Sequence, residues 1–140
     1  MKVAVVEDSL PVRRLLVRRA ENEPGVTVVA QATSEDEAVE AVLATSPDVV
    51  LLDIHLAPGS GFSVLKRLRQ RSFGGQVFVL SASDRATVAA QCERHGADGF
   101  YDKAFDFEQL MVDLRELARG GAANSRWMFH MDGARAVVNG

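Results

Sequence analysis

Five short aliphatic runs alternate with five segments of helical periodicity along this chain, and no other feature restricts its fold as strongly. The runs are rich in β-branched and aliphatic residues and lack the polar alternation of a half-exposed strand, which indicates buried parallel strands. We predict strands at residues 3–6, 26–30, 49–52, 77–80 and 99–101. We predict helices at residues 10–21, 34–44, 62–71, 85–95 and 107–118.

Five consecutive strand–helix units favour one architecture. It is an α/β fold, (βα)5, with a doubly wound five-stranded parallel sheet, right-handed crossovers and helices on both faces. We expect the flavodoxin-like strand order 2-1-3-4-5. Boundary residues agree with this division, since Ser9, Ser34 and Ser60 precede helical segments as candidate N-caps and Gly96 follows one as a candidate C′ residue. Ligands of such sheets bind at the carboxyl ends of the strands.

Length and composition limit the number of domains. A chain of 140 residues with 47% hydrophobic content can bury one substantial core but not two. We therefore expect one domain over residues 1–119. Residues 120–140 are expected to be a C-terminal tail or a truncated linker, because about 20 residues are too few for a separate effector domain.

Charge and hydropathy exclude several function classes. The formal charge of −3 offers no basic field for direct binding of nucleic acid. No run approaches the roughly 20 apolar residues of a membrane span, and the start of the chain lacks a signal-peptide layout. Cys92 is the only cysteine, so neither an intramolecular disulfide nor a cysteine zinc site is available. We expect a cytoplasmic protein.

Polar side chains follow four of the five predicted strands. Glu7 and Asp8 follow the first, Asp53 the third, Ser81 the fourth and Lys103 the fifth. Carboxyl ends of parallel strands meet at one edge of the sheet, so these groups should converge there. Three crowded carboxylates repel one another unless a cation neutralises them, and an all-oxygen set suits hydrated Mg²⁺. The sequence therefore predicts a magnesium site.

Asp53 is the candidate nucleophile of this site. The apolar run at residues 49–52 holds it on a buried strand instead of a loose loop. Carboxylates can accept phosphoryl groups, and such transfer depends mainly on positioning and on neutralising charge at the phosphoryl oxygens. The metal, Lys103 and Ser81 would supply that neutralisation.

Four segments carry a resemblance to the receiver domain of two-component response regulators, covering roughly residues 2–118. They are VVEDS at residues 5–9, VVLLDI at 49–54, VLSA at 79–82 and GADGFYDK at 96–103. The resemblance implies that Asp53 takes a phosphoryl group from a phosphohistidine. It also implies a Mg²⁺ (or Mn²⁺) ion held by Glu7, Asp8, Asp53 and the backbone carbonyl of His55.

The same resemblance implies a switch and its partners. Ser81 would contact the phosphoryl oxygen and move toward it, Lys103 would pair with it, and Phe100 would turn inward; His55 and Ser83 would tune the lifetime of the acyl phosphate. The implied partners are a sensor histidine kinase or a histidine phosphotransfer protein, and a downstream protein that meets the fourth helix, fifth strand and fifth helix. A homodimer through the fourth and fifth helices is a further possibility. The chain is then a signalling phosphoacceptor rather than an enzyme.

Two loops depart from the family pattern. Ala104 follows Lys103 where the family commonly has a proline after a cis peptide bond. A cis bond before a non-proline residue costs about 3 kcal/mol, so this loop should be either trans or strained. After Asp53, the proline expected at position 57 is shifted by one residue to Pro58.

Simpler interpretations exist for each residue taken alone. Glu7 and Asp8 could favour the start of a helix through its dipole, Ser81 and Ser83 could be helix caps, and Lys103 could be a solvated loop lysine. The Arg13-Arg14 pair and the basic residues of segment 66–71 are expected to coat solvated helix faces.

The sequence leaves three rival functions. A phosphatase resembling the haloacid dehalogenase family would need a second acid where His55 stands. A flavodoxin-like cofactor module would need a phosphate-binding loop in place of the acidic residues after the first strand. The strongest rival is a pseudo-receiver, a module that is never phosphorylated and binds its partner constitutively, and Ala104 with the altered loop after Asp53 is its support.

Overall fold

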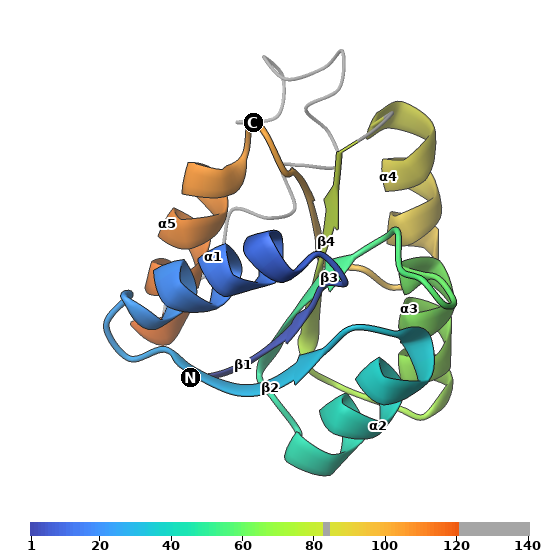
Figure 1. Cartoon of the computed structure of the whole chain (residues 1–140), viewed down its shortest axis with the longest axis horizontal. Coiled ribbons are helices and arrows are strands. Elements are labelled where there is room, and N and C mark those ends of the chain that lie inside the picture. Colours follow the sequence, from blue (N-terminus) through green and yellow to red (C-terminus); the bar gives the residue numbers. More distant parts are fainter. Residues whose placement is uncertain (83–84, 121–140) are drawn as a thin grey trace.

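The computed structural model describes residues 1–82 and 85–120 (Figure 1). Five parallel strands form a single sheet in the order β2-β1-β3-β4-β5, as predicted. The strands are β1 (Lys2–Val6), β2 (Thr27–Ala32), β3 (Val49–Asp53), β4 (Gln76–Ser81) and β5 (Gly99–Asp102).

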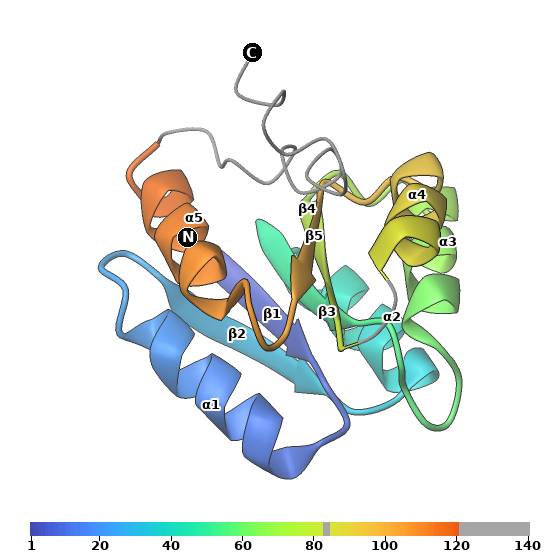
Figure 2. The same ribbon diagram turned by 90° about the horizontal axis from the view of Figure 1, so that it is seen from above.

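Helices cover both faces of the sheet, which confirms the doubly wound fold. Figure 2 shows α1 and α5 on one side of the strands and the other three helices on the opposite side. The helices are α1 (Leu10–Glu21), α2 (Glu35–Thr45), α3 (Gly61–Gln70), α4 (Arg85–Arg94) and α5 (Phe107–Ala118). Within the described residues, none of these helices is both long and apolar enough to cross a bilayer.

Burial follows the position of each strand in the sheet. Every residue of β3 is buried, and β1 and β4 are buried except at their first residues. The prediction of a buried second strand is wrong, because only Ala32 of β2 is buried. Its place at the edge of the sheet, paired with β1 alone, explains the difference.

Three strands extend one residue beyond their predicted ends, and in each case that residue is polar. Asp53 ends β3, Ser81 ends β4 and Asp102 ends β5. The ladder pairs Asp53 with Leu80, and Ser81 with Asp102. Sequence periodicity stops at the last apolar residue, but backbone pairing continues because it does not depend on the side chain. Asp53, Ser81 and Asp102 are therefore held in place by the sheet itself.

The predicted helix boundaries are largely confirmed. Ser60 caps α3, since its hydroxyl oxygen accepts a hydrogen bond of 3.0 Å from the backbone N–H of Ser63. Ser9 and Ser34 stand at N-cap positions, but neither side chain makes a capping hydrogen bond within the described residues. Gly96 follows α4 with a φ of +99°, the left-handed conformation expected of a C′ glycine.

Candidate functional site

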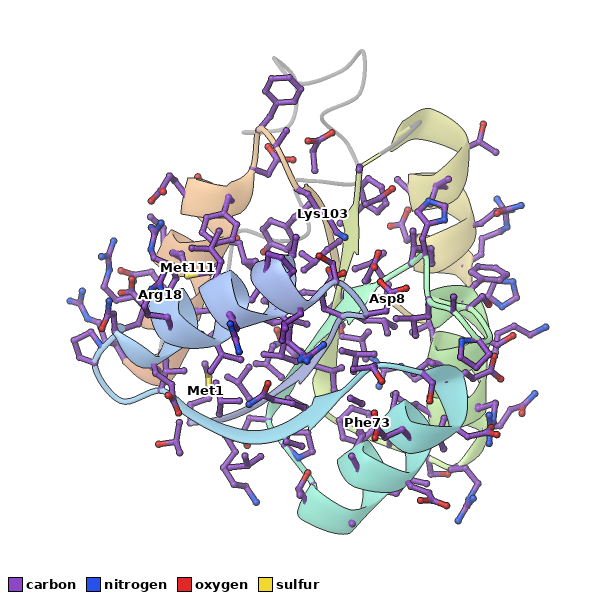
Figure 3. All side chains as sticks on the ribbon, viewed as in Figure 1. Met1, Asp8, Arg18, Phe73, Lys103 and Met111 are labelled. Carbon is purple, nitrogen blue, oxygen red and sulfur yellow. The ribbon has the colours of Figure 1, made fainter. Side chains whose placement is uncertain are left out.

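Three carboxylates meet at the carboxyl edge of the central strands. Glu7 and Asp8 follow β1 and Asp53 ends β3, and one oxygen from each lies within 4.8 Å of the others. Glu7 and Asp53 are only 1% and 2% exposed, whereas Asp8 is open to solvent. Figure 3 shows Asp8 and Lys103 at this edge, away from Met1, which lies toward the other. The predicted convergence of these side chains is thus observed.

Lys103 bridges the two buried carboxylates. Its Nζ lies 2.8 Å from Glu7 Oε1 and 3.3 Å from Asp53 Oδ2, and its side chain is 24% exposed. Lys103 is therefore not a solvated loop lysine. Glu7 is equally unlike a helix-dipole acid, because its carboxylate is buried and faces this ammonium group. The site is a compact ion cluster of two buried carboxylates and one cation, with a third carboxylate at its mouth.

Burial and neighbouring charges shift the pKa values of Glu7 and Lys103. Burial raises the pKa of Glu7, the charge of Asp53 adds to that effect, and the hydrogen bonds from Lys103 and Ser9 oppose it without cancelling it. Burial alone would lower the pKa of Lys103, but its contacts with Glu7 and Asp53 outweigh this and raise it. Burial at this site therefore disfavours the charged form of Glu7, as the raised pKa of its carboxyl indicates.

The Glu7→Gln variant should gain stability relative to wild type as the pH rises in metal-free buffer. Because the folded pKa of Glu7 lies above its ordinary value of 4.5, its contribution to stability is complete below that pH. That contribution is lost as the pH rises through the folded pKa, and glutamine has no such loss. Urea unfolding of both proteins with EDTA, from about pH 4 to about pH 8, measures the difference.

Glu40→Gln is the control for this comparison, because it removes the same charge from an exposed position of α2. If Glu7→Gln instead loses stability relative to the wild type as the pH rises, the pKa of Glu7 is not raised.

The donor set fits a hard divalent cation. Glu7 Oε1 is buried and, among the described residues, has no hydrogen-bond partner beyond its ion pair with Lys103. The three side chains offer only oxygen atoms, the ligand type that Mg²⁺ prefers, and the exposure of Asp8 leaves room for the waters that this ion retains. Glu7, Asp8 and Asp53 are the residues that would hold the ion. A ligand role for the His55 carbonyl stays a prediction.

Asp53 is fixed on two sides. Its Oδ1 accepts a hydrogen bond of 3.0 Å from the backbone N–H of His55, while its Oδ2 faces Lys103.

The start of α3 lies close against the end of β3. The backbone N–H of Gly61, the first residue of α3, donates to the Ile54 carbonyl at 2.9 Å. This close approach leaves no space for a side chain, since a Cβ at position 61 would clash with the backbone of Asp53 and Ile54. The His55 side chain itself is exposed.

The remaining predicted site residues lie on β4 and β5. Ser81 is fully buried, and its carbonyl accepts a hydrogen bond of 2.9 Å from the backbone N–H of Lys103. It is not a helix cap, because it ends β4 and α4 begins at Arg85. Phe100 is fully buried in β5. Ser83 lies outside the described residues.

The sequence alone does not predict the contacts made by three charged side chains near the site or in its scaffold. Arg13 donates to the Glu7 carbonyl at 3.0 Å, so it does not merely coat a solvated face. Arg69 likewise pairs with Asp98 at 3.0 Å and donates to nearby carbonyls. Asp102 binds the loop that follows Lys103. Sequence periodicity cannot reveal them, because each joins a side chain to a backbone or loop group whose position depends on the folded chain.

The fold and this site together define a class of protein. They describe an open α/β domain with carboxylates and a lysine gathered where such sheets bind ligands. A family model of the response regulator receiver domain matches residues 3–115. The chain belongs to this family, the phosphoacceptor signalling domains of two-component systems.

Individual relatives agree with this assignment. The nitrate/nitrite response regulator protein homolog of Haemophilus influenzae is 30% identical over 86% of this chain and 58% of the relative. NarL of Escherichia coli is 31% identical over 69% and 45%, so the chain spans about half the length of these relatives.

Solved structures give the same result. A LuxR-family two-component response regulator from Aurantimonas has a TM-score of 0.82 at 25% identity, covering 96% of this chain and 94% of the other. The receiver domain of a putative NarL from Mycobacterium tuberculosis has a TM-score of 0.77 at 28% identity, covering 85% and 96%.

Proposed function

We propose that Asp53 accepts a phosphoryl group from a phosphohistidine of a sensor histidine kinase or histidine phosphotransfer protein, with Mg²⁺ or Mn²⁺ bound beside it. One observation carries the proposal. Lys103 joins the buried carboxylates of Glu7 and Asp53, at 2.8 and 3.3 Å, next to the exposed carboxylate of Asp8. This arrangement supports the proposal, because the proposed nucleophile, a cation and the proposed metal ligands lie together at one edge of the sheet.

The chemistry follows from these positions. A carboxylate oxygen of Asp53 forms a bond to phosphorus as the phosphorus–nitrogen bond of the donor breaks, and the electron pair of that bond leaves with the imidazole. Lys103 offers its ammonium group to a phosphoryl oxygen, and the His55 amide holds Asp53 Oδ1 in place. A bound divalent ion would supply further neutralisation of the phosphoryl charge.

The output belongs to the same proposal. We infer that phosphorylation moves Ser81 toward the phosphoryl group and stabilises the buried position of Phe100, with His55 and Ser83 tuning the lifetime of the acyl phosphate. The changed surface of α4, β5 and α5 would bind a downstream protein and could support a homodimer, without direct contact to nucleic acid. Residues 1–119 form the receiver domain in this proposal. The predicted tail, apart from Gly120, lies outside the described residues.

Intact mass measurement tests the phosphoacceptor assignment. Wild-type protein incubated with Mg²⁺ and acetyl phosphate should gain the mass of one phosphoryl group, and Asp53→Ala should gain none. EDTA should prevent the gain because the donor set needs a cation. Asp48→Ala is the control: it removes an exposed aspartate just before the other end of β3, together with its hydrogen bond of 2.8 Å from the Lys2 N–H, and it should label normally.

No mass gain in a folded wild-type protein, with a phosphorylated histidine kinase also failing as donor, would overturn the proposal. The pseudo-receiver would then be the better description of this chain.

A further inference from the structure

Asp102 organises the loop that carries Lys103. It ends β5 immediately before the lysine and is 8% exposed. Its Oδ1 accepts two backbone hydrogen bonds, from Ala104 N–H at 2.7 Å and from Phe105 N–H at 3.0 Å. This is an Asx turn, in which an aspartate side chain replaces a backbone acceptor for the residues that follow it. Lys103 lies inside the turn.

The same loop is tied to the next helix. The backbone N–H of Asp102 donates to Asp106 Oδ2 at 2.8 Å, and the N–H of Asp106 donates to the Asp102 carbonyl at 2.9 Å. Asp106 stands at the N-cap position of α5, yet its carboxylate makes no capping hydrogen bond there. That carboxylate binds Asp102 instead, so the loop has two reciprocal links to the start of α5.

Lys103 is thus fixed by the backbone on both sides. On the strand side, its N–H donates to the Ser81 carbonyl at 2.9 Å. On the loop side, the Asp102 carboxylate holds the next two backbone N–H groups. The described residues contain a cis peptide bond at Ala57–Pro58 and none at Lys103–Ala104, so the lysine takes its position through an ordinary trans bond. The turn needs the N–H of residue 104, which a proline would not have.

We propose that Asp102 is a positioning residue for phosphoryl transfer, which aims the Lys103 ammonium group at the phosphoryl group through the Asx turn. This role rests on the proposed function of Asp53. It gives the chain a local device that orients the lysine where the proline of the family pattern is absent. Asp102 acts through Lys103 and touches neither the donor nor the transferred group.

In this proposal the Asp102 side chain acts as a hydrogen-bond acceptor, and its charge is not required. The variants therefore remove the acceptor and the charge separately. Asp102→Ala removes the acceptor and should lower the rate of phosphorylation by acetyl phosphate about tenfold, since small displacements of a catalytic group carry costs of that order or more. Asp102→Asn keeps an oxygen that can accept both N–H groups. It should stay within about twofold of the wild-type rate.

Asp98→Ala is the matched structural control. Asp98 lies just before the opposite end of β5, where it accepts a hydrogen bond from Val77 N–H at 2.9 Å and pairs with Arg69. Its loss should shift the urea unfolding midpoint without slowing phosphorylation of the folded protein. A purely structural Asp102 would behave in the same way.

The decisive experiment is a double-mutant cycle of Asp102→Ala with Lys103→Met, with phosphorylation rates measured by intact mass at saturating Mg²⁺. If Asp102 acts through Lys103, its replacement should slow the wild type about tenfold and the Lys103→Met protein less than about twofold. An equal slowing in both backgrounds, an unchanged rate in Asp102→Ala, or failure of Asp102→Asn to restore the rate would overturn the proposal.

The controls separate this failure from failure of the proposed function. If the wild type is phosphorylated normally and Asp102→Ala is phosphorylated at the same rate, only the positioning role is rejected. A folded wild type that never labels rejects the phosphoacceptor assignment, and the positioning role with it.

Discussion

Lys103→Met should destabilise the metal-free domain by about 3 kcal/mol and slow phosphorylation of Asp53 about 100-fold. Methionine keeps most of the length and apolar surface of lysine, so the change removes mainly the ammonium charge. Glu7 and Asp53 are 1% and 2% exposed, and both face the Lys103 ammonium group. Without it, two buried carboxylates confront each other, and removing one partner of a buried ion pair is costly.

The loss of stability should be smaller in Mg²⁺ than in EDTA, because a bound divalent ion replaces the missing positive charge. The loss of rate should persist at saturating Mg²⁺, because the ammonium group is no longer available to the phosphoryl oxygens. Urea unfolding with and without Mg²⁺ measures the first effect, and intact mass against time measures the second.

Lys66→Met is the control, since Lys66 is an exposed lysine of α3. It should leave both the unfolding midpoint and the rate unchanged. A Lys103→Met protein as stable in EDTA as the wild type would show that the ammonium group does not balance the two carboxylates.

Gly61→Ala should destabilise the domain by about 3 kcal/mol and impair phosphorylation, although alanine is the better helix former. Gly61 begins α3, where alanine alone would favour the helix by up to about 1 kcal/mol. A Cβ at this position, however, would lie 2.7 Å from Ile54 Cα and 2.9 Å from the carbonyl carbon of Asp53. Backbone atoms cannot rotate away as a flexible side chain can, so either α3 or the end of β3 must move.

Gly74→Ala is the matched control, because a Cβ there meets nothing within 4 Å. It should be neutral or slightly stabilising through its effect on the unfolded chain. Urea unfolding of both variants gives the stability difference, and phosphorylation of the folded fraction shows whether Asp53 has been displaced. Equal stabilities for Gly61→Ala and the wild type would contradict the close approach of α3 to β3.

The sequence predicted the fold well because the fold depends on local patterns. Five apolar runs and five helical segments were enough for the sheet, its strand order and its two helical layers, since few topologies accommodate such alternation. The prediction failed for the burial of β2, because only the assembled sheet shows which strand lies at an edge. It also ended three strands one residue early, where backbone pairing continues past the apolar run.

The candidate site also has features that the sequence predicts and features that only the tertiary structure decides. The convergence of Glu7, Asp8, Asp53 and Lys103 was predictable from the sequence, because carboxyl ends of parallel strands always meet at one edge. The choice of Lys103 as counterion to both buried acids, and the Asx turn of Asp102 that orients it, were decided by the tertiary structure. Such contacts depend on distances between atoms of different elements, and those distances exist only once the sheet and its loops have packed.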